Sequence, residues 1–242
     1  MSLMRMQKIH TSLFFLTLLS LLGFEYPVSN LYAPNPEILG TGSHRWIEKE
    51  IAILRGQSNN IDRNVLRLSL NAYVHAREEG LDTKQLLTII DFTKPSSEKR
   101  LWVFDIKHGK AVLNTWVSHG KNSGALKAQS FSNNPGSLKS SIGVFVTDDN
   151  PYLGEHGYSL RIYGLEKGFN DNAFRRDIVI HGAWYVNTDI IKKYGAIGRS
   201  FGCPAVSNNM VKSLIDTIKQ KTVIFAYYPD KNWLSHSRFL MA

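Results

Sequence analysis

The chain has 242 residues, a single cysteine and a formal net charge of +9 at pH 7. Hydrophobic residues make up 43% and charged residues 20% of the sequence, which is ordinary for a globular protein and excludes disorder, collagen and coiled coil. One cysteine excludes an intrachain disulfide and any metal site built from several cysteines. A chain of this length is expected to form one compact domain with an appendage.

The N-terminus has the layout of an export signal. Arg5 and Lys8 precede residues 12–24, an uncharged run of 13 residues, which is shorter than the roughly 18 residues that span a bilayer. A basic start and a short apolar core are typical of a secretory signal peptide. We therefore expect residues 1–33 to be a signal peptide and the rest of the chain to be periplasmic or secreted. An uncleaved membrane anchor is the alternative.

The positive charge suits a protein that meets anionic surfaces outside the cytosol, such as cell-wall polymers and lipid head groups. It equally fits an ordinary solvated surface. The sequence has no run of clustered Lys and Arg, no zinc-finger spacing and no RNA-binding aromatic motif, so nucleic acid is not expected as a partner.

Residues 34–95 are expected to form an N-terminal helical region. Apolar residues recur at helical spacing as far as Gly80, which is a typical helix stop. Thr83 is a candidate cap for a further short helix over residues 86–90. A turn signal at residues 94–97 then marks the boundary of this region.

Residues 96–242 have the pattern of short strands, and we expect an α+β fold whose β-rich domain is mostly antiparallel. Runs rich in β-branched and aromatic residues are bounded by Gly, Asn or Pro, and they lie at 101–106, 111–117, 142–147, 158–163, 178–181 and 222–228. The sequence His108-Gly109-Lys110 is typical of a hairpin turn. Residues 207–220 carry one apolar stripe, which predicts a late amphipathic helix.

The lone cysteine lies in a loop of residues that shape the backbone. Cys203 is flanked by Gly202 and Pro204, whereas a structural cysteine usually packs as a small hydrophobe within an apolar run. Gly202 allows a reactant to approach backbone N–H groups closely, and such groups stabilise an oxyanion. A thiol kept outside the cytosol is open to oxidation, which suggests that it is used. These features favour Cys203 as a nucleophile over an inert cysteine.

A thiol with a pKa of about 8.5 needs a base to attack at neutral pH. His181 closes the strand run at 178–181 and is followed by Gly182, so we expect its ring to project rigidly into a cleft. His156 is the competing base, because it also lies next to a strand run. His119 lies in a loop and is expected to be structural. We favour His181, because an activating base must be held within hydrogen-bond reach of the thiol.

Two short motifs resemble a known family. His181-Gly182, followed 18 residues later by Ser200-Phe201-Gly202-Cys203, is similar to the H-G and S-x-G-C signature of L,D-transpeptidase catalytic domains, which have the YkuD-like fold. Further similarity to the exported Gram-negative branch, the murein L,D-transpeptidase catalytic domain family, lies at 118–124, 131–133, 156–160, 168–173 and 227–230. The resemblance covers about residues 61–230 and implies that residues 96–242 form the catalytic domain.

The resemblance implies a cysteine-dependent acyl transfer that acts on peptidoglycan stem peptides. Cys203 would form a thioester with a donor stem, and His181 would be the base, with its other ring nitrogen held by a backbone carbonyl. An acceptor amine, usually that of a diaminopimelate, would resolve the thioester into a cross-link. The N–H groups of Gly202 and Cys203 would form the oxyanion hole, Ser200 would order the loop and Gly182 would support it. No metal or organic cofactor is implied.

The sequence departs from the family pattern in two places. Pro204-Ala205 stand where better-known members have an aliphatic residue and an Arg or Asn, and the interval of 22 residues from His to Cys is longer than usual. Arg199 is a candidate for the missing cation that binds a substrate carboxylate, or else a solvated loop residue. His156 and Tyr158 are further candidates for substrate binding.

Three functions stay open on the sequence alone. Water could resolve the thioester in place of an amine, which would make the chain an L,D-carboxypeptidase or endopeptidase on the same scaffold. A non-enzymatic wall-binding protein would fit the charge and the export signal but would leave the Gly-Cys-Pro loop without a use. Papain-like amidases place Cys before His, and sortases need an Arg shortly after Cys, whereas the next Arg here is Arg238. Labelling of the thiol by a carbapenem, which acylates this family's cysteine, would distinguish enzyme from binder.

Overall fold

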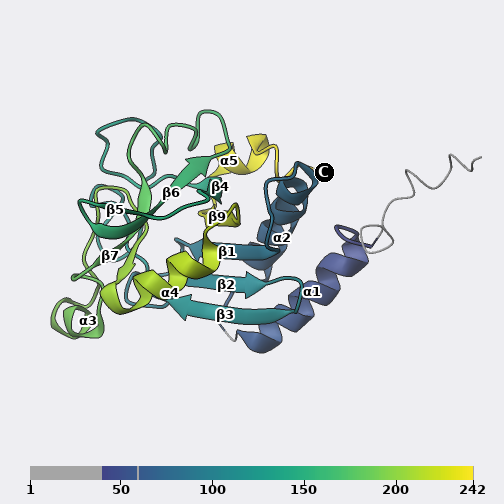
Figure 1. The fold of residues 1–242 in the computed structure, drawn as a ribbon, viewed down its shortest axis with the longest axis horizontal. Coiled ribbons are helices and arrows are strands. Elements are labelled where there is room, and N and C mark those ends of the chain that lie inside the picture. The colour runs from purple at the N-terminus through teal and green to yellow at the C-terminus, as the bar shows by residue number, and fades with distance from the viewer. Residues whose placement is uncertain (1–39, 59, 242) are drawn as a thin grey trace, which may run out of the picture. The chain divides into compact units, whose positions relative to one another are not determined.

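A nine-stranded mixed sheet organises the part of the chain that the structure describes (Figure 1). The structure is a computed structural model, and it describes residues 40–58 and 60–241. The strand order is β3-β2-β1-β9-β4-β6-β7-β8, and β5 pairs with β6. The strands are β1 (Leu86–Asp91), β2 (Leu101–Asp105), β3 (Lys110–Thr115), β4 (Gly143–Thr147), β5 (Tyr152–Gly154), β6 (Gly157–Gly164), β7 (Val179–Ala183), β8 (Ala205–Ser207) and β9 (Val223–Tyr227).

Helices flank this sheet and begin at side chains that satisfy free backbone N–H groups. Ser43 caps the first helix by accepting from the N–H of Trp46, and Asp62 caps the second by accepting from two N–H groups, as helix starts require. The helices are α1 (His44–Gln57), α2 (Arg63–Glu78), α3 (Thr188–Tyr194), α4 (Asn208–Ile218) and α5 (Lys231–His236). Among the described helices, none has both the length and the apolar character to span a bilayer. The predicted signal peptide, residues 1–33, lies outside the described residues.

The expected fold class is confirmed. Most strand pairs are antiparallel, and the hairpin turn after β2 pairs Asp105 with Lys110 as predicted. Two pairs are parallel, β1 with β9 and β7 with β8, so the sheet is mixed. The late helix is present as α4, and its buried residues Leu214, Ile215 and Ile218 come from the predicted apolar stripe.

The short helix predicted over residues 86–90 is wrong, because this segment is strand β1. All six residues of β1 are buried, since β2 pairs with it on one side and β9 on the other. A short run that is apolar throughout does not distinguish a central strand from a buried helix by periodicity. Thr83 caps no helix, and its hydroxyl instead donates to the carbonyl of Gln220 at 2.6 Å.

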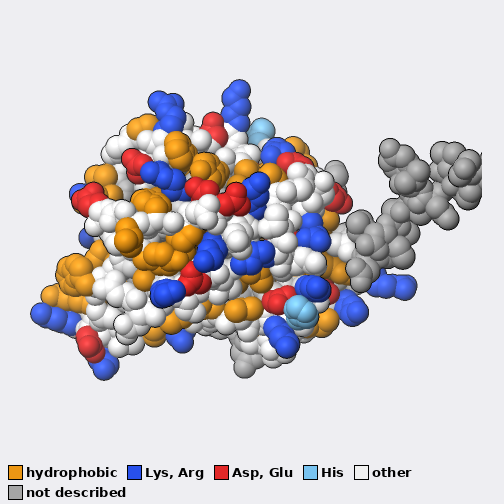
Figure 2. All heavy atoms as spheres, in the orientation of Figure 1, with side chains coloured by type: hydrophobic (Ala, Val, Ile, Leu, Met, Phe, Trp, Pro, Cys, Tyr) orange, Lys and Arg blue, Asp and Glu red, His pale blue; other side chains and the backbone are white. Residues whose placement is uncertain are grey.

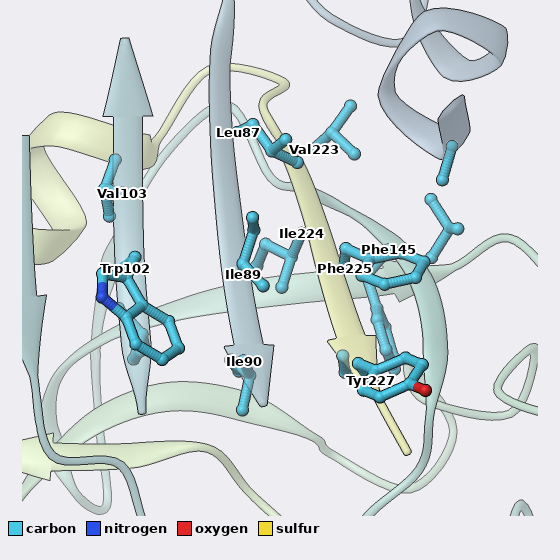
Figure 3. Packing of buried hydrophobic residues seen from close by; sticks show 14 of the residues in the cluster. Leu87, Ile89, Ile90, Trp102, Val103, Phe145, Val223, Ile224, Phe225 and Tyr227 are labelled. Carbon is cyan, nitrogen blue, oxygen red and sulfur yellow. The ribbon is translucent and has the colours of Figure 1, made fainter. Parts of the chain in front are cut away.

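The main core joins the N-terminal helices to the middle of the sheet. Helix α2 contacts β1 and β9, and α1 contacts α2 and β3. Figure 3 shows apolar side chains of β1, β2, β4 and β9 packed side by side, among them Ile89, Trp102 and Phe225. Helix α4 contacts β6, β7 and β8, so it supports the end of the sheet that carries His181.

A buried Arg–His pair fixes the loop that follows β3. The guanidinium of Arg100 donates to Nδ1 of His119 at 2.8 Å and to the carbonyl of Val117. Because Nδ1 accepts, the proton of His119 lies on Nε2, which donates to the carbonyl of Gly124 at 3.2 Å. Burial, together with the charge of Arg100, lowers the pKa of His119 to about 4. His119 is therefore a neutral structural residue in the folded chain.

This pair predicts a loss of stability in mild acid. Between pH 6.5 and 4 the unfolded chain protonates His119 while the folded chain does not, so the free energy of unfolding should fall by about 3 kcal/mol over that range. Urea unfolding at pH 7 and pH 4 measures this fall. His119→Gln should lose most of it, whereas His44→Gln, at an exposed position, should retain it. An equal fall in wild type and His119→Gln would contradict the assignment.

Candidate active site

A cleft of about 460 Å³ lies at the ends of β7 and β8. It brings together six of the predicted site residues, which are His156, His181, Gly182, Arg199, Ser200 and Cys203. Gly202 lies behind it, against Ile178 and the backbone of Lys139. Tyr158 does not line the cleft. Its hydroxyl donates to Asp216 of α4 at 2.7 Å, so this tyrosine anchors strand β6 to the helix instead of facing the site.

Strand pairing brings His181 and Cys203 to the same place. The parallel register of β7 and β8 sets His181 opposite Ala205, and Cys203 precedes Ala205 by two residues. Ser118 fixes the start of β8, because its N–H donates to the carbonyl of Ala205 and its hydroxyl accepts from the N–H of Ala205. Both side chains therefore line one cleft although 22 residues separate them in sequence.

His181 is held in one tautomer. Its Nδ1 donates to the carbonyl of Gly182 at 2.9 Å, and a carbonyl only accepts, so Nε2 carries the lone pair. Burial lowers the pKa of His181, the bond to Gly182 opposes that change, and repulsion from His156 adds to it. The His181 ring is therefore neutral at pH 7.

Cys203 is 8% exposed, and its Sγ lies against the backbone at the start of β7. Sγ is 3.5 Å from the N–H nitrogen of Val179 and 3.5 Å from the carbonyl oxygen of Asp177. Burial raises the pKa of the thiol, while the N–H of Val179 and the charge of Arg176 oppose that rise. Among the described residues, Sγ makes no hydrogen bond to the His181 ring. A proton could pass from Sγ to Nε2 only after the thiol turns from β7 toward the His181 ring, and such contacts often tighten when substrate binds.

The hydroxyl of Ser200 orders the cysteine loop. It donates to the carbonyl of Cys203 at 2.6 Å and accepts from the N–H of Gly202 at 3.1 Å. The expectation that both Gly202 and Cys203 direct their N–H groups into the cleft is therefore wrong for Gly202. Apart from its own thiol, the N–H of Cys203 has no hydrogen-bond partner among the described residues. This leaves the N–H of Cys203 free to donate to a ligand in the cleft.

Arg176 is a site residue that the sequence reasoning missed. One end of its guanidinium donates to the carbonyl of Ser132 and the hydroxyl of Ser141, each at 2.6 Å, and the other end donates to the carbonyl of Lys139 at 2.6 Å. It thereby ties the 132–141 loop to the back of the cysteine loop and places a positive charge near the thiol. The only sequence signal for Arg176 was its place as the second residue of a basic pair, shortly before β7.

Cations and aromatic rings form the rim of the cleft. Arg199 is exposed, and its Nη1 donates to the carbonyls of Lys121 and Gly124 at 3.1 Å. The Nζ of Lys121 lies 4.6 Å from the ring centroid of Phe201. Phe201 and Trp184 are 66% and 71% exposed. Exposed aromatic side chains beside a cleft are typical of a binding surface, and their sequence signal was their place in and just after the two motifs.

The glycine at position 202 is required by both conformation and space. Its φ is +134°, and a Cβ there would lie 2.9 Å from the carbonyl oxygen of Lys139 and 3.0 Å from Cδ1 of Ile178. The described residues contain no group of three or more His, Cys, Asp or Glu side chains that could hold a metal ion. The residues that line this cleft offer a thiol, two imidazoles and backbone N–H groups for chemistry.

The segments that build the cleft also match a known family. A model of the L,D-transpeptidase catalytic domain matches residues 57–227. The chain belongs to the L,D-transpeptidase catalytic domain family. This confirms the resemblance carried by the His-Gly and Ser-x-Gly-Cys motifs, both of which lie inside the matched range. A comparison with curated protein sequences gives no match.

Solved structures that are described as L,D-transpeptidases share little sequence identity with this chain. An L,D-transpeptidase from Mycobacterium smegmatis is 14% identical, with 60% of this chain and 59% of that chain covered and a TM-score of 0.35. An L,D-transpeptidase from Stackebrandtia nassauensis is 13% identical, with 74% and 76% covered and a TM-score of 0.35. The chain spans less than two thirds of the mycobacterial structure. Sequence identities and TM-scores this low carry no argument about the activity of this chain.

Replacement of Gly202 by alanine should cost more than replacement of another left-handed glycine. Gly202→Ala combines backbone strain with close contacts to Lys139 and Ile178 and should destabilise the fold by about 2–4 kcal/mol. Gly168→Ala is the matched control, because its φ is +84° and a Cβ added there would meet nothing within 4 Å, and it should cost about 1 kcal/mol. Urea unfolding measures both, and equal losses would contradict the packing argument.

Proposed function

We propose that the chain is an exported peptidoglycan L,D-transpeptidase that works through a Cys203 thioester. The observation that carries this proposal is the arrangement of a neutral His181, with Nε2 free, on the same cleft as Cys203. Family membership supports the kind of reaction. The catalytic roles of the two residues and the export of the chain are parts of the proposal.

The pKa directions favour a neutral pair over a preformed ion pair. Burial raises the pKa of the Cys203 thiol and lowers the pKa of His181, so both groups are uncharged at rest. Such a pair transfers its proton only as the nucleophile attacks, and this is general-base catalysis. The charge of Arg176 opposes the rise in the thiol pKa and would stabilise the negative charge that develops on sulfur.

The first half of the reaction forms a thioester. His181 Nε2 takes the proton of Cys203 as Sγ attacks the carbonyl carbon of the donor stem peptide, and the N–H of Cys203 donates to the oxygen that becomes negative. The C–N bond of the amide then breaks, and the leaving amine takes the proton from the imidazolium. The peptide remains bound to sulfur as an acyl group.

The second half returns the enzyme to its resting state. The amine of an acceptor stem attacks the thioester and gives one proton to His181 Nε2. The C–S bond breaks, the sulfur takes that proton back, and a new amide joins the two stems. Water in place of the amine would give a carboxylic acid, which is the hydrolytic alternative on the same residues.

The rim of the cleft fits an anionic peptide. Arg199 and Lys121 supply positive charge beside the exposed ring of Phe201, and stem peptides carry free carboxylates. We propose that the Arg199 nitrogens not bound to the 121–124 loop bind a substrate carboxylate. On the face shown in Figure 2, Lys and Arg are scattered among Asp and Glu, so the positive net charge would act on an anionic cell wall as a diffuse field.

Export is proposed from the sequence. Residues 1–33 have the basic start and short apolar core of a signal peptide, and a peptidoglycan substrate lies outside the inner membrane. The proposed location of the mature protein is therefore the periplasm or the exterior of the cell.

Incubation of the purified protein with a disaccharide-tetrapeptide tests the proposed reaction. Mass spectrometry should detect a cross-linked dimer and the released terminal amino acid, and neither should form with Cys203→Ala. A trimmed tripeptide without dimer would show that water resolves the thioester and would replace transfer by hydrolysis. An unchanged tetrapeptide would favour a non-enzymatic wall-binding protein and contradict the proposal.

A further inference from the structure

The ring of His156 stacks on the ring of His181. The two ring centroids are 4.3 Å apart, and the ring planes differ by 26°. His156 lies in the turn between β5 and β6, and its ring nitrogens make no hydrogen bond among the described residues. Stacking on His181 is therefore the contact that defines its position.

The hairpin that carries His156 is held firmly against the site. Ser159 pairs with His181 across β6 and β7 and with Tyr152 across β5 and β6. The hydroxyl of Tyr158 donates to Asp216 of α4 at 2.7 Å. The chain from Tyr158 to Ser159 is thus fixed on two sides, and the turn just before it places His156 over the imidazole of His181.

We propose that His156 is a positioning residue that acts through His181, holding the plane of its ring and opposing the arrival of a second proton on it. The inference rests on the proposed function, in which His181 is the base. The hydrogen bond from His181 to Gly182 fixes the rotation of the His181 ring. The stacked ring of His156 fixes the tilt of the His181 ring and covers one of its faces. A base whose rotation and tilt are both fixed needs no buried carboxylate to orient it.

The charges around His181 agree with this role. Groups from three elements line the cleft beside His181. The loop before β8 contributes Arg199 and the neutral thiol of Cys203. The segment after β7 contributes Tyr185, and α4 contributes the uncharged Asn208. Burial is the main cause that lowers the pKa of His181, and repulsion from His156 lowers it further. His156 thus widens the pH range in which His181 stays a free base.

Two substitutions separate positioning from other roles. His156→Phe keeps an aromatic ring on His181 but removes the charge, and His156→Ala removes both. At pH 8, kcat on the disaccharide-tetrapeptide should stay within about threefold of wild type in His156→Phe. It should fall about tenfold in His156→Ala, and KM should be nearly unchanged in both variants. The acidic limb of kcat/KM should move to higher pH in His156→Phe. His108→Phe, in the hairpin turn between β2 and β3, is the control and should change nothing.

Other outcomes would overturn the inference. A loss of kcat by about 10²-fold or more in both variants would make His156 the base itself. A raised KM with unchanged kcat would make it a substrate-binding residue, and an unchanged pH profile in His156→Phe would remove its electrostatic role.

An NMR titration of the His181 ring separates failure of this inference from failure of the proposed function, because it needs no turnover. The pKa of His181 should be higher in His156→Phe than in wild type, even if the protein proves to have no transpeptidase activity. An equal pKa in the two proteins would contradict the inference. Thermal unfolding of each variant shows whether the fold is retained.

Discussion

The parallel pairing of β7 with β8 is the constraint on which the site depends. It sets Ala205 opposite His181, so the cysteine two residues earlier must return beside the strand that carries the proposed base. The same closeness buries both groups, and burial disfavours the charged form of each. One feature of the sheet thus determines both the meeting of His181 with Cys203 and their neutral resting state.

The surrounding residues supply what a neutral pair lacks. The carbonyl of Gly182 fixes the tautomer of His181, where a serine hydrolase would use a carboxylate. Arg176 brings the positive charge that offsets part of the cost of a buried thiolate. Ser200 occupies the N–H of Gly202, and in the proposed reaction the N–H of Cys203 serves the reacting oxygen. Each of these groups is held by backbone contacts, so these supports are in place before the thiol turns toward His181.

The sequence alone predicts those parts of the site that depend on local pattern. Cys203 in a Gly-Pro loop and His181 at a strand end stand out by local pattern, and the structure places both on one cleft. No local pattern signals the contact of Tyr158 with α4 or the contacts of Arg176, because their partners lie 58 and 35–44 residues away in sequence. Strand β1 has a pattern that also fits a helix because it is buried on both sides, and the three-residue strands β5 and β8 are too short to leave a periodic signal.

Covalent labelling by a carbapenem tests the central claim, that Cys203 is a nucleophile activated by His181. Peptide mapping by mass spectrometry should find one adduct, on Cys203, and no adduct in Cys203→Ala. His181→Ala should label more slowly by about 10²-fold or more, because the thiol has lost its base. An adduct on another residue, or labelling of His181→Ala at the wild-type rate, would contradict the account.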